Sequence, residues 1–159
     1  MAGAGRRGGT ADAVPDGSDR GNHRGLADPR RARQNPRNII DGEEPAGSAD
    51  ATAYFDWWPV QGSAQEWVEL TFAKPERVSS TDVYWFDDTG RGGVRVPASW
   101  RLFYQSAGEW LPVTTQGVYG VSRNAWNTVA FAPVTTSALR IELTMQQGFS
   151  AGLQEWKVK

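Results

Sequence analysis

The stretch ALRIELTM, residues 138–145, decides the fold class, because apolar and polar side chains alternate along it from Leu139 to Met145. Leu139, Ile141 and Leu143 fall on one face of an extended chain, and the polar residues between them fall on the other. This alternation predicts an antiparallel β-strand with one face toward a core and the other toward solvent.

Further strand-like stretches lie before and after this one, and turn residues separate them. Gly108, for example, lies between two of them, as in a β-hairpin. Helical periodicity is hard to find beyond residue 38, and no repeat period is visible. The sequence therefore predicts an all-β domain, an antiparallel β-sandwich. The other predicted strands are residues 67–72, 78–86, 100–104, 110–113, 127–131 and 153–159.

Two longer connections interrupt the strand pattern, at residues 87–99 and 116–126. In sandwiches such loops gather at the ends of the sheets and carry function on a rigid frame. The sequence therefore predicts that binding residues lie in these loops.

Residues 1–37 differ in composition from the rest of the chain. Val14 and Leu26 stand nearly alone among Gly, Ala, Asp, Pro and Arg. Such a segment cannot bury enough apolar surface to offset its ordering entropy, so we expect a disordered tail before a domain at residues 38–159. A beginning rich in Gly, Ala and Arg is also typical of a gene start placed too early, and both readings stay open.

Charge divides the chain in the same way. The first 37 residues hold eight arginines and four aspartates, about +4, which leaves the rest near −5 of the whole-chain −1. An acidic body argues against nucleic acid as a partner. A solvated tail is the expected role of the basic segment, with RNA or an anionic membrane as the alternative.

Several classes of protein are excluded or unexpected. Cysteine is absent, which excludes disulfides and thiolate chemistry. No apolar run approaches the ~20 residues of a membrane span, and the first residues lack the apolar core of a secretory signal. His23, the only histidine, lies in the tail, so no histidine-based triad or metal centre is expected. Asp87 and Asp88 are adjacent and cannot flank one glycosidic bond on an extended chain.

Five motifs occur in a recognisable order: IIDG at 39–42, WVELTF at 67–72, WRLFY with GEWLPV at 100–113, ALRIEL at 138–143 and LQEWKV at 153–158. Together they resemble discoidin or coagulation-factor C-type domains and the carbohydrate-binding modules that share their fold. The resemblance covers about residues 38–159 and implies a galactose-binding-like jelly-roll sandwich.

A narrower resemblance lies in VYWFDDTGRGGVRVPASW, residues 83–100, and QGFSAG, residues 147–152. Both are similar to the accessory sandwich at the C-terminal end of bacterial β-L-arabinofuranosidase-type glycoside hydrolases, whose catalytic part is a helical barrel. The resemblance implies a non-catalytic domain severed from that barrel, with exported relatives. The strand expected before Asp41 would fall in the arginine-rich segment.

The resembled fold often holds a structural calcium ion where the Asp-Gly loop meets the last strand. The matching positions here are Asp41 and Glu155, with Glu44 or Ser48 as a further ligand. Calcium takes six to eight hard oxygens, which such a loop supplies. The alternative is that Asp41 only starts a turn with Gly42 and that Glu155 faces solvent.

The loop at residues 87–95 is the predicted sugar site. Carboxylates and guanidinium groups bind sugar hydroxyls, and aromatic rings stack on sugar faces. The alternative is that the acids and arginines pair with one another and fix a rigid loop. The candidate ligand-binding residues are Asp87, Asp88, Arg91 and Arg95, with Trp57, Trp58, Tyr119 and Phe149 as aromatic partners.

The remaining tryptophans on strands are expected in the core or between the sheets, and at least one of Trp57 and Trp58 is expected to face outward. The expected core tryptophans are Trp67, Trp85, Trp100, Trp110 and Trp156.

These observations predict a non-catalytic accessory domain of a carbohydrate-active enzyme. It either binds a plant-type glycan or docks on a glycoside hydrolase catalytic domain. A glycan-binding domain predicts an aromatic platform with polar groups beside it, and a docking domain predicts an exposed apolar patch. The alternative function is a discoidin-like domain that contacts protein or lipid head groups.

Overall fold

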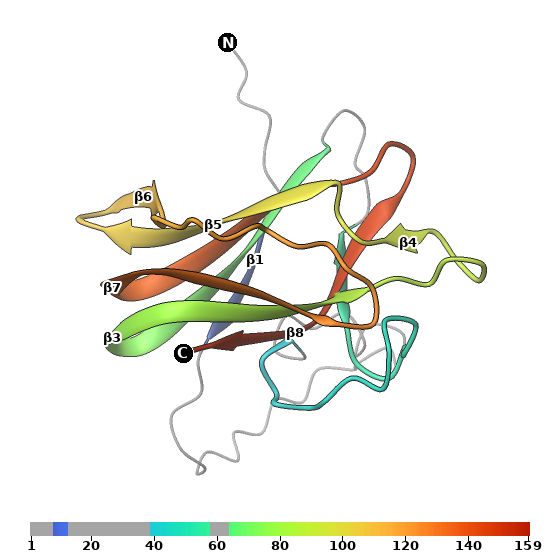
Figure 1. Cartoon of the computed structure of the whole chain (residues 1–159), viewed down its shortest axis with the longest axis horizontal. Helices are drawn as coiled ribbons and strands as arrows, with labels where there is room; N and C mark the ends of the chain where they lie inside the picture. The colour runs from blue at the N-terminus through green and yellow to red at the C-terminus, as the bar shows by residue number, and fades with distance from the viewer. Residues whose placement is uncertain (1–7, 13–38, 58–63) are drawn as a thin grey trace, which may run out of the picture.

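The computed structural model describes residues 8–12, 39–57 and 64–159, and for residues 8–12 only the backbone (Figure 1). All regular elements in these ranges are β-strands, which confirms the predicted antiparallel sandwich, and none is a helix able to span a membrane. The strands are β1 (Gly8–Asp12), β2 (Phe55–Trp57), β3 (Gln65–Phe86), β4 (Val94–Arg95), β5 (Ser99–Ser106), β6 (Glu109–Pro112), β7 (Trp126–Thr144) and β8 (Ser150–Val158).

Two long strands, β3 and β7, run through both layers of the sandwich (Figure 1). The first half of β3 pairs with the second half of β7, and this ladder continues into β5 and β6. The second half of β3 pairs with the first half of β7 and with β8, which also pairs with β2 and β4. One core cluster draws residues from both halves.

Each long strand contains two of the predicted strands. The gap between the predicted strands 67–72 and 78–86 contains Pro75 and coincides with a register shift between Thr71 and Glu76, where β3 bends from one layer into the other. Pro133 lies in the corresponding part of β7. Proline is tolerated where a ladder hydrogen bond is already missing, so these residues bend the strands without ending them.

Tryptophans organise the core. Trp85 and Trp100 are almost fully buried and meet edge to face, with ring centroids 5.5 Å apart. Both indole N–H groups donate to the carbonyl of Gly120, at 3.2 and 2.8 Å. The buried Trp156 donates to the Thr81 hydroxyl at 2.6 Å. The predicted core positions of these three tryptophans are confirmed, and the shared carbonyl fixes the long loop before β7 to the core.

The two predicted loops approach each other, because Arg123 of residues 116–126 lies 3.4 Å from Asp87 of residues 87–99. Ser99 at the start of β5 and Gln65 at the start of β3 both pair with Thr144 at the end of β7. The loops before β5 and after β7 therefore leave from neighbouring strand ends. The chain just before β2 lies against the second layer, where Tyr54 stacks on Phe86 at 3.9 Å.

β1 pairs parallel with the first half of β3, from Gly8 opposite Trp67 to Asp12 opposite Thr71. Five residues of the segment expected as a disordered tail therefore form an edge strand. The rest of that segment, residues 1–7 and 13–37, lies outside the described residues, and its disorder stays a prediction.

A substitution at Gly152 of β8 tests how closely the loop that contains β4 packs on the sheet. A Cβ atom at this position would lie 2.9 Å from Phe86 and 2.9 Å from Val94. We expect Gly152→Ala to lower the free energy of unfolding by about 1–3 kcal/mol, because overpacking forces the backbone to shift. Gly93→Ala is the control, since a Cβ atom there meets nothing within 4 Å. Urea denaturation measures both, and equal stabilities would contradict the packing.

Candidate functional site

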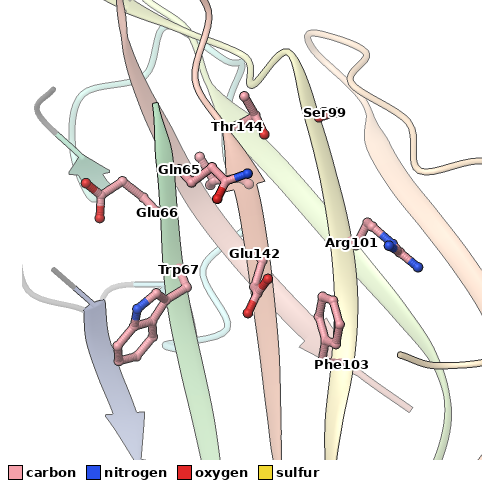
Figure 2. A pocket seen from close by; sticks show the side chains of 9 residues that line it. Gln65, Glu66, Trp67, Ser99, Arg101, Phe103, Glu142 and Thr144 are labelled. Atoms are coloured by element: carbon pink, nitrogen blue, oxygen red, sulfur yellow. The ribbon is translucent and has the colours of Figure 1, made fainter. Parts of the chain in front are cut away.

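A cleft of about 190 Å³ lies on the outer face of the first layer, and we call it the sheet-face cleft. Figure 2 shows the carboxylate of Glu142 between the ring of Trp67 on β3 and the ring of Phe103 on β5. The cleft therefore combines aromatic and polar side chains on three neighbouring strands. Its lining residues are Gln65, Glu66, Trp67, Ser99, Arg101, Phe103, Glu142, Leu143 and Thr144.

The strand register places six of these side chains in two rows on one face. Gln65, Thr144 and Ser99 form one row across β3, β7 and β5. Trp67, Glu142 and Arg101 form the next row, two residues along each strand. Side chains two residues apart point to the same face of a sheet. The same alternation that buries Leu139, Ile141 and Leu143 therefore turns the second row outward.

Arg140 fixes two residues of the cleft, Trp67 and Glu142. Its guanidinium lies 4.7 Å from the ring centroid of Trp67 and 4.2 Å from that of Trp110. Its Nε donates to Glu69 at 2.9 Å, and its Nη1 lies 3.4 Å from Glu142. Two rings and two carboxylates thus immobilise one cation, which fixes the orientation of Trp67 and Glu142.

The expectation that all five strand tryptophans lie in the core is wrong for two of them. Trp67 and Trp110 are only partly buried and lie on the outer face of the first layer with Arg140. The hydrophobicity of tryptophan suggests burial, but the strand register decides which face of the sheet each side chain occupies. The signal available in the sequence was the alternation itself, because Trp67 and Val68 cannot both point inward.

The predicted loop site is built differently from the expectation. Asp87 is buried, and its carboxylate accepts hydrogen bonds from the Thr89 N–H and hydroxyl and from the Val96 N–H. Burial alone would raise the pKa of Asp87, but these hydrogen bonds and the nearby Arg123 lower it. Asp87 therefore fixes the loop as an internal anion.

Asp88 and Arg95 pair at 3.4 Å, as in the alternative that the sequence left open. Asp88 also accepts from the Val94 N–H at 2.8 Å, and Arg95 lies 4.4 Å from the ring centroid of Phe149. Arg91 is exposed at the loop tip. Arg95 of this loop thus contacts Phe149, while Asp87 and Asp88 bind groups of the loop itself.

Of the other predicted aromatic partners, Trp57 and Tyr119 make no stacking contact with Arg95 in the described structure. Trp57 is 5% exposed and belongs to the core, where its N–H donates to the Trp67 carbonyl. Tyr119 packs edge to face on Trp100 at 4.8 Å. Trp58 lies outside the described residues, so the expectation that at least one of Trp57 and Trp58 faces outward stays a prediction.

The predicted metal residues fall into two groups. Glu155 and Asp41 come together: the Gly42 N–H donates to Glu155 Oε1 at 3.0 Å, and the Asp41 charge acts on the Glu155 carboxyl. Glu44 instead pairs with the ammonium of Lys157. The Ser48 hydroxyl accepts from the Asn124 N–H at 2.8 Å. Within the described ranges, no three His, Cys, Asp or Glu residues form a ready-made metal site.

Gln154 is a residue that the sequence analysis missed. Tyr84 pairs with Glu155 but Trp85 pairs with Leu153, so Gln154 forms a β-bulge in β8. Its Nε2 donates to the carbonyls of Gly47 and Asp50, and its buried Oε1 meets no donor among the described residues. Gln154 also lines a small pocket of about 60 Å³ with Asp41, Glu43, Glu44, Pro45, Asp50, Thr52 and Ala53.

The fold and its loops define a galactose-binding-like β-sandwich. Residues 26–155 match the F5/8 type C domain family, and this chain belongs to that family. The match begins within the arginine-rich segment, before the domain boundary expected at residue 38.

Solved structures with the same fold include domains of carbohydrate-active proteins. The β-galactosidase BgaA of Streptococcus pneumoniae superposes with a TM-score of 0.68 at 13% identity, over 82% of this chain and 89% of that one. A family 32 carbohydrate-binding module of C. perfringens NanJ, solved with galactose, gives 0.58 at 18% identity, over 79% and 85%. A pectin-binding module gives 0.56 at 18% identity, over 79% of each chain. At these identities the likeness shows the fold alone.

Glu155 makes stability depend on pH. Burial, with the Asp41 charge added, raises the pKa of Glu155 from 4.5 to about 7. A raised folded-state pKa gives stability that is complete below about 4.5 and is lost as the pH rises through 7. In chelator, we expect Glu155→Gln to lose less stability than the unsubstituted chain between pH 5 and pH 8. Glu109→Gln, at an exposed carboxylate, is the control for denaturant titrations. Parallel pH profiles for all three proteins would contradict this role.

Proposed function

We propose that this chain is a non-catalytic glycan-binding domain and that the sheet-face cleft is its binding site. The observation that carries the proposal is the cleft lining, in which Trp67 and Phe103 lie beside Glu142 and Arg101. Aromatic rings stack on the apolar faces of sugars, and charged groups bind their hydroxyls. Arg140 supports the proposal because it fixes the ring and the carboxylate before a ligand arrives.

A docking role finds less support. Docking on a catalytic barrel predicts an exposed apolar patch. In the described ranges, the exposed large hydrophobic residues are Leu111, at 37%, and Val118, at 83%, and they lie in different segments. The acidic body also disfavours anionic lipid head groups. Sugar binding therefore fits this surface better than either alternative.

An accessory role beside a glycoside hydrolase is the second part of the proposal. The resemblance of residues 83–100 to β-L-arabinofuranosidase-type accessory sandwiches supports it, and so does the fold shared with a domain of a β-galactosidase. Plant-wall arabinan and galactan are accordingly the first glycans to test. Arg91, Arg95 and Phe149 form a second candidate contact at the loop end.

We also propose that calcium binds between segment 39–57 and β8, where it would pin the loop to the sheet without taking part in chemistry. Asp41 and Glu155 would supply carboxylate oxygens, and the buried Gln154 Oε1 an amide oxygen. These are the hard ligands that calcium prefers. The pairing of Glu44 with Lys157 and the hydrogen bonds of Ser48 argue for a smaller role of these two residues.

Calcium is tested by thermal unfolding. We expect calcium to stabilise the chain by about 2.7 kcal/mol at a concentration one hundred times its Kd. The effect should be larger at pH 8 than at pH 5, because Glu155 binds the ion in its charged form. Asp41→Asn and Glu155→Gln should remove the effect, and Glu109→Gln should keep it. A Tm indifferent to calcium and chelator would overturn the proposal.

Glycan binding is tested by calorimetry with arabinan and galactan. We expect Trp67→Ala to weaken binding about tenfold, since a stacking ring is lost. Glu142→Gln should weaken binding less, because an amide still accepts a hydrogen bond. Val118→Ala removes an exposed apolar side chain elsewhere and should bind like the unsubstituted chain. Absence of binding to both polysaccharides, or equal affinities for all variants with unchanged Tm, would overturn the proposed site.

A further inference from the structure

From the shape and charge of the sheet-face cleft, we infer that its ligand is the interior of a neutral polysaccharide chain, and not a chain end or an acidic sugar. This inference rests on the proposed function and adds the class of glycan. It is carried by three features of the described residues: the position of the cleft, its length and its charge balance.

The described lining of the cleft comes from strands and not from a loop. Strands β3, β7 and β5 form its floor, and the exposed Gln65, Ser99 and Arg101 form its rim. No described loop residue belongs to the lining. A site for a chain end needs a wall against the terminal sugar, as loops at the end of a sandwich supply. A site on a sheet face lets a chain enter and leave.

The length of the cleft exceeds a single sugar ring. Ser99, Arg101 and Phe103 follow one another along the same face of β5. At about 3.4 Å per residue, the first and last of them lie about 14 Å apart. Polar Ser99 and Thr144 line one end of the cleft, and the aromatic Phe103 lines the other. The cleft therefore offers separate contacts to successive sugar units.

The charged groups in and beside the cleft carry no excess of positive charge. Arg140 is held by Glu69 and Glu142, and its side chain is only 15% exposed. Arg101 lies directly opposite Glu142 in the register and 5.6 Å from the ring centroid of Phe103. With Glu66, which also lines the cleft, these two cations and three anions leave no excess positive charge to attract a carboxylate or sulfate. The acidic body, near −5, adds repulsion toward a polyanion.

The experiment compares ligands of increasing length and different charge. Calorimetry of the full chain uses arabino- and galacto-oligosaccharides of increasing length, the two parent polysaccharides and polygalacturonate. We expect affinity to rise about tenfold from the shortest to the longer oligosaccharides of the neutral ligand that binds. Several protein molecules should bind each polysaccharide chain. Polygalacturonate should bind weakly or not at all.

A variant separates the contacts along the cleft. Phe103→Ala should weaken binding of the longer oligosaccharides about tenfold and so remove the gain in affinity with length. Val118→Ala should keep both the affinity and its gain with length, and Tm measurements verify folding. One protein per chain, affinity that does not grow with length, or tighter binding of polygalacturonate would overturn the inference while leaving glycan binding intact. Absence of binding to all of these ligands would overturn the proposed function itself.

Discussion

β3 and β7 pair antiparallel over almost their whole lengths, from Gln65 opposite Thr144 to Tyr84 opposite Trp126. Each strand bends once and enters both layers, so a single ladder holds the sandwich together. Because side chains alternate along a strand, this register also decides which residues face the core and which face solvent. A slip by one residue would bury Glu142 and expose Ile141. The core and the sheet-face cleft therefore depend on the same pairing.

Arg140 shows how the outer face remains ordered without a covering layer. A buried or half-buried cation is stable only when its partners compensate for lost hydration. Here Glu69 and Glu142 supply the charge, and the rings of Trp67 and Trp110 supply the contact surface. The group links β3, β7 and β6 across the sheet. Large aromatic side chains can thus remain on a solvent-facing surface in fixed orientations, which is what a stacking platform requires.

The sequence predicted the fold better than the site, for a physical reason. Alternation in residues 138–145 and the order of motifs are local signals, and both describe strands of the observed sandwich. The cleft depends on which strands lie side by side, and Gln65, Ser99 and Thr144 are far apart in the sequence. Trp67 was assigned to the core from its hydrophobicity, although its neighbours Glu66 and Val68 are the buried residues. Gln154 could not be found, because a bulge has no clear sequence signal.

The loop at residues 87–95 explains why polar residues in a connection are ambiguous. Asp87 and Asp88 have the chemistry of a sugar site, but their oxygens accept backbone N–H groups of the same loop. A carboxylate saturated by such donors gains little from a sugar hydroxyl, because binding would exchange one hydrogen bond for another. On the sheet face the backbone groups are already paired in the ladder. Outward side chains there do not have to satisfy backbone donors, and Glu142 pairs with Arg140, so the proposed binding site lies on the regular part of the fold.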